Sequence, residues 1–318
     1  MPPRQHTDPA TVAALVVAVL AISASGAMIV YAAAPAIAIA FWRNAMAVGA
    51  LAPVALVRRR EELASLARGP VRREGLFCVL AGVALATHFL TWVPSVKLTT
   101  VAAATALGAT QPVWQGLIAV GQGRRLPRLT WFGIAVAVLG AAAATGADVG
   151  VSTTAVLGDL LAVAGGMAAA VYTALGERAR VTTSTTSYTA VCYTVCAAVL
   201  LVVCLVARVP LTGYPATAWL ALVGLAVGPQ LLGHSLFNFS LRRVSATTIS
   251  VLILLEVPGA ALIAWAWLGQ MPRPGAWPGL ALLLAGVAVV VLAGRRARDA
   301  ASAPVEEPEA GVIDPSSP

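Results

Sequence analysis

The stretch LILLEVPGAALIAW, residues 252–265, is apolar except for one carboxylate, Glu256. It belongs to a longer apolar run from about 245 to 268. A helix needs about 20 apolar residues to cross a hydrocarbon core of about 30 Å. The run therefore predicts a membrane-spanning helix with a charged group near its middle, where burial of an ion is costly.

The composition extends this interpretation to the whole chain. Hydrophobic residues make up 59% of the 318 residues and charged residues 11%, with a mean hydropathy of +0.86. Soluble domains average about 25% charged residues, so the bilayer is the expected solvent. Ten apolar runs are long enough to cross it, at 11–33, 36–57, 74–95, 98–120, 129–147, 155–176, 185–207, 216–239, 245–268 and 275–294.

The basic residues predict the orientation. With the N-terminus inside the cell, 17 of the 21 Lys and Arg fall in cytoplasmic segments, and Lys97, Arg208 and Arg273 fall outside. This imbalance predicts a plasma-membrane protein with both termini cytoplasmic. Residues 1–10 form the cytoplasmic N-terminus, and 295–318, rich in Pro, Ala and acids, form a disordered cytoplasmic tail. Arginines dispersed in short loops do not suggest nucleic-acid binding.

The chain repeats itself after 146 residues. His88 aligns with His234, Pro112 with Pro258, and further matches include Gly123 with Gly269 and Trp131 with Trp277. The predicted repeats, 11–147 and 155–294, each hold five spans, and an odd number places the two copies in opposite orientations. The predicted fold class is thus an all-α integral membrane protein of ten transmembrane helices in two inverted five-helix repeats.

Glu256 and Arg43 are the charged candidates for a site inside the membrane. At 1.5 Å per residue, Arg43 lies about 11 Å and Glu256 about 14 Å from the outer face. We therefore expect an ion pair or a shared substrate clamp, with Glu256 binding a substrate cation or a proton. The alternatives are a buried acid bonded to neighbouring helices and an arginine that reaches the outer headgroups.

Other polar residues are candidates for the same cavity. Counting from Glu74 places His88 in the outer half of the membrane, and counting from Ala216 places His234 near the inner end. Either imidazole can relay protons or bond a neighbouring helix. Weaker candidates are Gln111, Asn44, Asn238 and Gln230. Helix kinks are expected at Pro112 and Pro258, because proline removes a backbone hydrogen bond.

From the sequence, we expect the protein not to be an enzyme and to bind no metal or cofactor. The four cysteines, Cys78, Cys192, Cys196 and Cys204, lie in apolar runs without partners for a metal, and read as packing residues. No nucleotide-binding G-x-x-x-x-G-K-[ST] motif is present, so ATP is not expected to drive the protein directly. The expected partners are a small molecule and the lipid bilayer, and a homodimer through the glycine-rich helix faces is left open.

Four segments resemble the EamA branch of the drug/metabolite transporter superfamily. They are FWRNAMA (41–47), ATHFLTWVPSVKLTTVAAATALGATQPVW (86–114), GDLLAVAGGMAAAVYTALGERAR (158–180) and LFNFSLRRVSATTISVLILLEVPGAALIAWAWLGQ (236–270). The resemblance implies a ten-helix exporter of small metabolites that works by alternating access. The family's glutamate at the end of spans four and nine is replaced here by Arg124 and Gln270. Val257 also separates Glu256 from its proline.

These observations predict a secondary transporter that exports amino acids or related small metabolites, with proton coupling left open. One alternative is a multidrug or xenobiotic exporter with an aromatic cavity, for which Trp42, Trp92, Trp114, Trp265 and Trp267 are available. An alternative of another class is a membrane sensor or scaffold that does not transport.

Overall fold

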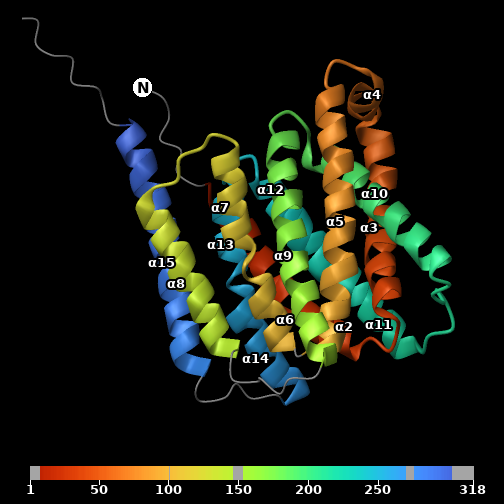
Figure 1. Cartoon of the computed structure of the whole chain (residues 1–318). Helices are drawn as coiled ribbons and strands as arrows, with labels where there is room; N and C mark the ends of the chain where they lie inside the picture. Colours follow the sequence, from red (N-terminus) through yellow and green to blue (C-terminus); the bar gives the residue numbers. More distant parts are fainter. Residues whose placement is uncertain (1–7, 100, 146–152, 270–275, 303–318) are drawn as a thin grey trace, which may run out of the picture.

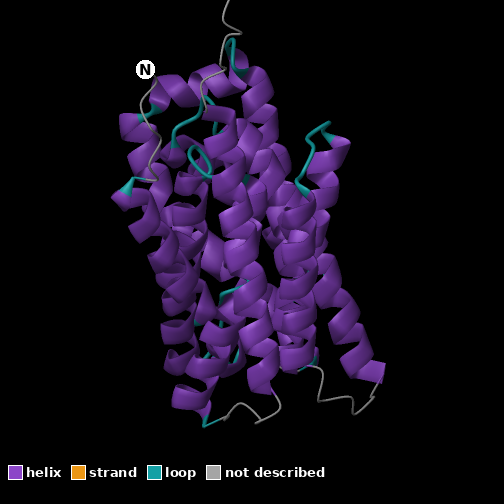
Figure 2. Ribbon diagram, turned by 90° about the vertical axis from the view of Figure 1, so that its left-hand side faces the viewer, coloured by secondary structure: helices purple, strands orange, loops and turns teal. Residues whose placement is uncertain are grey.

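The structure is a computed structural model that describes residues 8–99, 101–145, 153–269 and 276–302. Regular structure in these ranges is entirely helical (Figures 1 and 2). In chain order the helices are α1 (Pro9–Ser23), α2 (Ser25–Tyr31), α3 (Ala36–Arg58), α4 (Arg60–Arg68), α5 (Arg72–Leu98), α6 (Val101–Gly108), α7 (Gln111–Gly121), α8 (Arg128–Thr145), α9 (Thr153–Ala179), α10 (Thr185–Val206), α11 (Ala216–Leu225), the π-helix η1 (Ala226–His234), α12 (Ser235–Ser240), α13 (Ala246–Ile253), α14 (Glu256–Leu268) and α15 (Ala276–Ser302).

Seven helical segments of the described chain are long and apolar enough to cross a membrane: 9–31, 36–58, 72–98, 153–179, 185–206, 216–240 and 246–267. Two shorter apolar segments, 128–140 and 277–290, belong to α8 and α15. The predicted all-helical membrane fold is confirmed. The predicted disordered tail is wrong over 295–302, where α15 continues because Arg and Ala favour helix, and 303–318 lie outside the described residues.

Two of the predicted spans are broken in the middle at equivalent positions. α6 ends at Gly108 and α7 begins at Gln111, while α13 ends at Ile253 and α14 begins at Glu256. Pro112 and Pro258 stand in the first turn of the second half-helix, where a missing N–H leaves no intrahelical bond unmade. A two-residue turn joins each pair of half-helices. The N–H of Thr110 bonds Leu107 C=O and that of Leu254 bonds Val251 C=O, so each α-helix is interrupted by a tighter turn directly before its proline.

A third span changes its helical type. α11 continues through nine residues of π-helix, η1, into α12. Pro229 lies inside η1 and has no N–H to donate, and Ser235 N–H bonds Gln230 C=O five residues back. Long π-segments are rare and occur mostly at functional sites, because they re-aim the side chains that follow.

Glycines allow α8 and α15 to touch through their backbones. A Cβ added at Gly140 would lie 2.3 Å from Leu283 N, and one at Gly286 would lie 2.4 Å from Ala137 N. Small residues permit such close approach between membrane helices. Figure 1 shows α8 and α15 side by side at one edge of the bundle. These glycine faces are used within the chain, so they do not argue for a homodimer.

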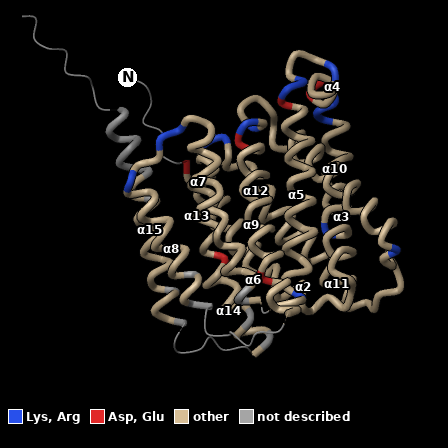
Figure 3. The backbone as a smooth tube through the Cα atoms, in the orientation of Figure 1, with Lys and Arg blue, Asp and Glu red and all other residues tan. Residues whose placement is uncertain are grey.

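Charged residues gather at one end of the bundle, which we call the α4 end because it carries α4 (Figure 3). There Arg124 pairs with Glu177 at 2.9 Å, and Glu177 also accepts a hydrogen bond from Ala246 N–H at 2.9 Å. This contact joins the ends of α7, α9 and α13. At the same end Arg243 lies 3.7 Å from Asp8 at the start of α1.

Glu62 of α4 caps the N-terminus of α10. Its carboxylate accepts hydrogen bonds from Ser184 N–H at 2.6 Å and from the Ser184 hydroxyl at 2.7 Å. Partial burial raises the pKa of Glu62, but the Ser184 hydrogen bonds and the nearby Arg59 outweigh it and hold the pKa below its usual value. The carboxylate therefore adds an N-terminal cap to α10 from a distant part of the chain.

Candidate functional site

The broken helices and the π-helix surround a central cavity of about 80 Å³. A site for one water needs about 10–15 Å³ on this measure, so the cavity has room for several waters or a compact solute. Its polar lining consists of Ser25, Arg43, His88, Thr105, Gln111, Tyr172, Thr173, His234, Asn238 and Glu256, and its aromatic carbon comes from Phe89, Trp92 and Phe237.

Arg43 enters the cavity from α3 with its side chain 1% exposed. Its Nε donates to Gln230 Oε1 at 3.0 Å and its Nη1 to the Ser25 hydroxyl at 3.4 Å. Its guanidinium carbon lies 4.3 Å from the centre of the Phe89 ring, a distance at which the ring face attracts a cation. Arg43 is thus held inside the bundle and does not reach the headgroups.

Glu256 is the first residue of α14 and lines the same cavity. Its carboxylate forms no ion pair with Arg43 and makes no hydrogen bond to other described residues. The predicted ion pair is therefore wrong. The two charges share one cavity, as their predicted depths require, but Arg43 uses Gln230 and Ser25 as its partners instead.

The two repeat-related histidines meet. The ring centres of His88 and His234 are 6.2 Å apart, and the His88 Nδ1 lies 2.9 Å from Gly165 C=O. The predicted difference in depth is therefore wrong. α5 has 27 residues, about 40 Å of helix, so it projects beyond the hydrocarbon core and Glu74 does not mark the membrane face.

The weaker candidates divide into two groups. Gln111 lines the cavity and donates to the Thr173 hydroxyl at 3.3 Å, and Asn238 exchanges hydrogen bonds with the Tyr172 hydroxyl at 2.7 and 2.9 Å. Asn44 does not line the cavity, because its amide donates to Ala40 C=O one turn back in α3. Gln230 does not line the cavity either, but its side chain accepts a hydrogen bond from Arg43, which does.

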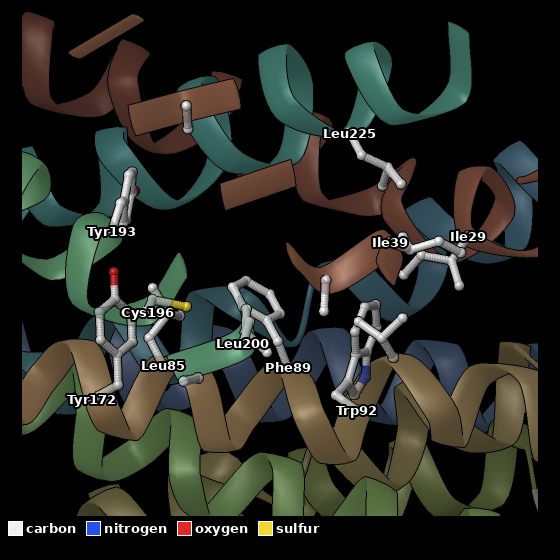
Figure 4. Packing of buried hydrophobic residues seen from close by; sticks show 14 of the residues in the cluster. Ile29, Ile39, Leu85, Phe89, Trp92, Tyr172, Tyr193, Cys196, Leu200 and Leu225 are labelled. Atoms are coloured by element: carbon white, nitrogen blue, oxygen red, sulfur yellow. The ribbon is translucent and has the colours of Figure 1, made fainter. Parts of the chain in front are cut away.

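An aromatic wall completes the site. The His88 ring stacks on Trp92 with centres 5.9 Å apart, and Phe89 and Tyr172 contact His234 with centres 5.5 and 6.0 Å apart. Figure 4 shows Phe89, Trp92 and Tyr172 within the buried packing. Sequence reasoning missed Phe89, Tyr172 and Ser25. Tyr172 carried a signal, since it is a polar residue inside an apolar run, but Phe89 carried none.

A bundle of membrane-spanning helices with interrupted helices around a central cavity that carries polar groups is found in many secondary transporters. The model of the EamA-like transporter family matches residues 10–146 and 156–292. The chain belongs to this family, and the family match covers two repeats, as the 146-residue shift predicts. This confirms the resemblance found in the sequence.

A solved structure described as "Crystal structure of protein" has the same fold. It is 21% identical in sequence, with a TM-score of 0.71, and the match covers 90% of this chain and 98% of that chain. No curated protein matches this sequence.

Proposed function

We propose that the protein is a secondary transporter of the plasma membrane that exports amino acids or related small metabolites by alternating access. The chain crosses the bilayer ten times in this proposal, with the broken pairs α6–α7 and α13–α14 each making one crossing. The α4 end faces the cytoplasm, because cytoplasmic loops of membrane proteins carry the excess of Lys and Arg. Two inverted repeats then alternate around the central cavity.

The observation that supports this function is a central cavity lined by an arginine and a glutamate that make no direct contact with each other. Arg43 and Glu256 both line it, and the described residues pair them with no opposite charge. Ionisable side chains without a direct partner inside a membrane protein are costly, so this pair favours a polar solute that bears complementary groups.

The sequence contains no Walker motif, so the proposed energy source is an ion gradient or the gradient of the substrate itself. Glu256, His88 and His234 are the groups in the cavity that can take up a proton. We therefore include proton coupling in the proposal, with these three side chains as the groups that would carry the proton.

The multidrug alternative has weaker support. Of the five tryptophans that favoured it, Trp92 lines the cavity, whereas Trp42, Trp114, Trp265 and Trp267 do not. A broadly selective drug site is expected to present larger apolar surfaces. No feature of the cavity favours the alternative of a membrane sensor or scaffold.

Counterflow tests the proposed function. The purified protein is reconstituted in liposomes preloaded with unlabelled compounds, and uptake of the matching labelled amino acids and small metabolites is measured. We expect exchange with a limited subset of the panel above that of empty liposomes. A folded protein, verified by its thermal unfolding, that exchanged no member of the panel would contradict the proposal.

A further inference from the structure

Six exposed arginines lie in and beside α4, at the end of the bundle that this helix marks. We call them the α4 arginines: Arg58, Arg59, Arg60, Arg68, Arg72 and Arg73. Figure 3 shows basic residues around this helix. The same segment, 58–74, holds three acids, Glu61, Glu62 and Glu74, so six positive and three negative groups leave a net charge of +3. A patch with this surplus attracts anions.

The α4 arginines lack the partners that other arginines at this end have. Arg124 pairs with Glu177 at 2.9 Å, and Arg243 lies 3.7 Å from Asp8. None of the α4 arginines forms an ion pair with a carboxylate of the residues that the structure describes. Their charges are therefore available to a group from outside the chain.

The helix dipole does not explain the arginines at the start of α5. Arg72 and Arg73 are the first two residues of this helix, and a helix N-terminus carries a partial positive charge that disfavours cations. Glu74 follows them in the same turn, but one acid does not balance two arginines. An anion at this place would interact favourably with the arginines and with the dipole.

α4 packs on the bundle through one face. Leu66 is buried on that face, and the Glu62 carboxylate bonds Ser184 at the start of α10. Arg60 and Arg68 are exposed, and the period of 3.6 residues places them on the opposite face. α4 thus presents two of its arginines on the side that the bundle does not cover.

The α4 arginines also adjoin the surface that faces lipid chains. Leu56 and Val57, directly before Arg58 in α3, are exposed, and so are Leu76 and Leu80 in the first turns of α5. Exposed apolar side chains on membrane-spanning helices lie against acyl chains. Because α3 and α5 pack against each other, the arginines at their ends stand where acyl chains give way to headgroups.

We propose that the α4 arginines and the adjoining ends of α3 and α5 bind an anionic phospholipid of the cytoplasmic leaflet. A guanidinium binds phosphate oxygens through two parallel N–H donors, and anionic lipids attract clusters of about four to eight basic residues beside a membrane-spanning helix. A zwitterionic phospholipid has the same phosphate, but its own cation is repelled by the patch. This inference goes beyond the proposed function, because it does not involve the transported molecule.

Two lipids with the same acyl chains test the site. Phosphatidylglycerol is anionic and phosphatidylcholine is zwitterionic, and each is titrated into the detergent-solubilised protein while thermal unfolding is measured. Native mass spectrometry counts the lipids that stay bound. We expect phosphatidylglycerol to stabilise the protein at concentrations at least about tenfold lower, since each arginine near an anionic surface contributes about fivefold in affinity. Inorganic phosphate at the same concentrations should have no effect.

Arg60→Gln combined with Arg68→Gln removes two charges from the exposed face of α4. It keeps Arg59, whose charge favours the ionised Glu62 that caps α10. We expect the preference for phosphatidylglycerol to fall several-fold in this double variant, with one lipid fewer retained in the mass spectrum.

A second double variant, Arg58→Gln with Arg72→Gln, acts at the ends of α3 and α5 and should give a similar loss. Arg125→Gln with Arg128→Gln is the matched control, because it removes the same charge from two exposed arginines at the α7–α8 connection. Thermal unfolding verifies each fold, and if one of the α4 double variants does not fold, the other decides.

The outcomes distinguish the lipid site from the transporter. Equal stabilisation by the two lipids would overturn the site, as would equal stabilisation by inorganic phosphate. A loss of preference that the control variant shared in full would mean that only the overall charge counts, and would overturn it too. Counterflow in liposomes that contain both lipids is read separately: exchange without a lipid preference leaves the transporter alone, and a lipid preference without exchange leaves the lipid site alone.

Discussion

At the scale of single residues, Glu256 is a cavity carboxylate that lacks a hydrogen-bond or ion-pair partner among the described residues. It begins α14, lines the cavity and makes no hydrogen bond or ion pair with the described residues. A buried carboxylate without a partner loses its hydration, and a bound cation from outside the protein would offset that loss. We therefore expect Glu256 to bind a ligand or a proton in the cavity.

Glu256→Gln tests this function with almost no change in side-chain size. The substitution removes the carboxyl group that would bind the amine of a substrate or a proton, so exchange should fall about tenfold or more. Counterflow measures the change, and thermal unfolding verifies the fold. Exchange at the wild-type rate would show that Glu256 does not contact the substrate.

Counting residues along a helix located Arg43 and Glu256 at a common depth, and both line the cavity. The same counting failed for His88 and His234 because α5 extends beyond the hydrocarbon core. The hydrogen bond between Arg43 and Gln230 could not be predicted, since it depends on how η1 re-aims its side chains. Asn44 was misplaced because a helix position alone does not tell whether an amide bonds its own helix.

At the scale of elements, contacts between distant segments close the helix ends. Glu62 provides the cap of α10, and Glu177 caps α13 while pairing with Arg124. Arg124 stands where the family has a glutamate, and its ion pair with Glu177 gives the changed charge a partner. Apolar runs predicted the helices themselves well, but not these side-chain caps, which need residues far apart in the sequence.

Glu62→Gln should destabilise the protein by about 1 kcal/mol at neutral pH, because a charged acceptor at a helix start is replaced by a neutral one at a partly exposed site. The folded pKa of Glu62 is lowered, so its contribution is present above the unfolded value of about 4.3 and is lost as the pH falls through the folded pKa.

Thermal unfolding of wild type and Glu62→Gln at pH 7 and at lower pH, down to about pH 3, measures this difference in stability. The difference should shrink as the pH falls below about 4.3. Glu61→Gln is the matched control, because the exposed Glu61 is the neighbouring acid in α4 and does not cap α10. An equal loss of stability in both variants would show that the Ser184 contact contributes nothing.

At the scale of the whole molecule, the internal repeat predicts where each loop lies. Two copies of five crossings place the α4 end on one side of the bilayer and the α10–α11 connection on the other. The four native cysteines are buried in the structure, so single added cysteines report their own positions without interference.

Ala64→Cys in α4 and Thr212→Cys between α10 and α11 are the two reporters, and both positions are exposed. A membrane-impermeant maleimide added to intact cells should label Thr212→Cys and leave Ala64→Cys unlabelled until the membrane is opened. The reverse pattern would place the α4 end outside the cell, against the distribution of arginines.

α8 belongs to the first repeat and α15 to the second, and their backbones meet at Gly140 and Gly286. Beside these glycines, Ile134 of α8 packs in one buried cluster with side chains of α15. A close-packed contact of this kind resists separation, so the two helices stay together while the rest of each repeat moves. We therefore expect this edge of the bundle to act as the fulcrum on which one repeat tips against the other. A larger residue at either glycine would then jam the motion while leaving the distant pocket chemically intact.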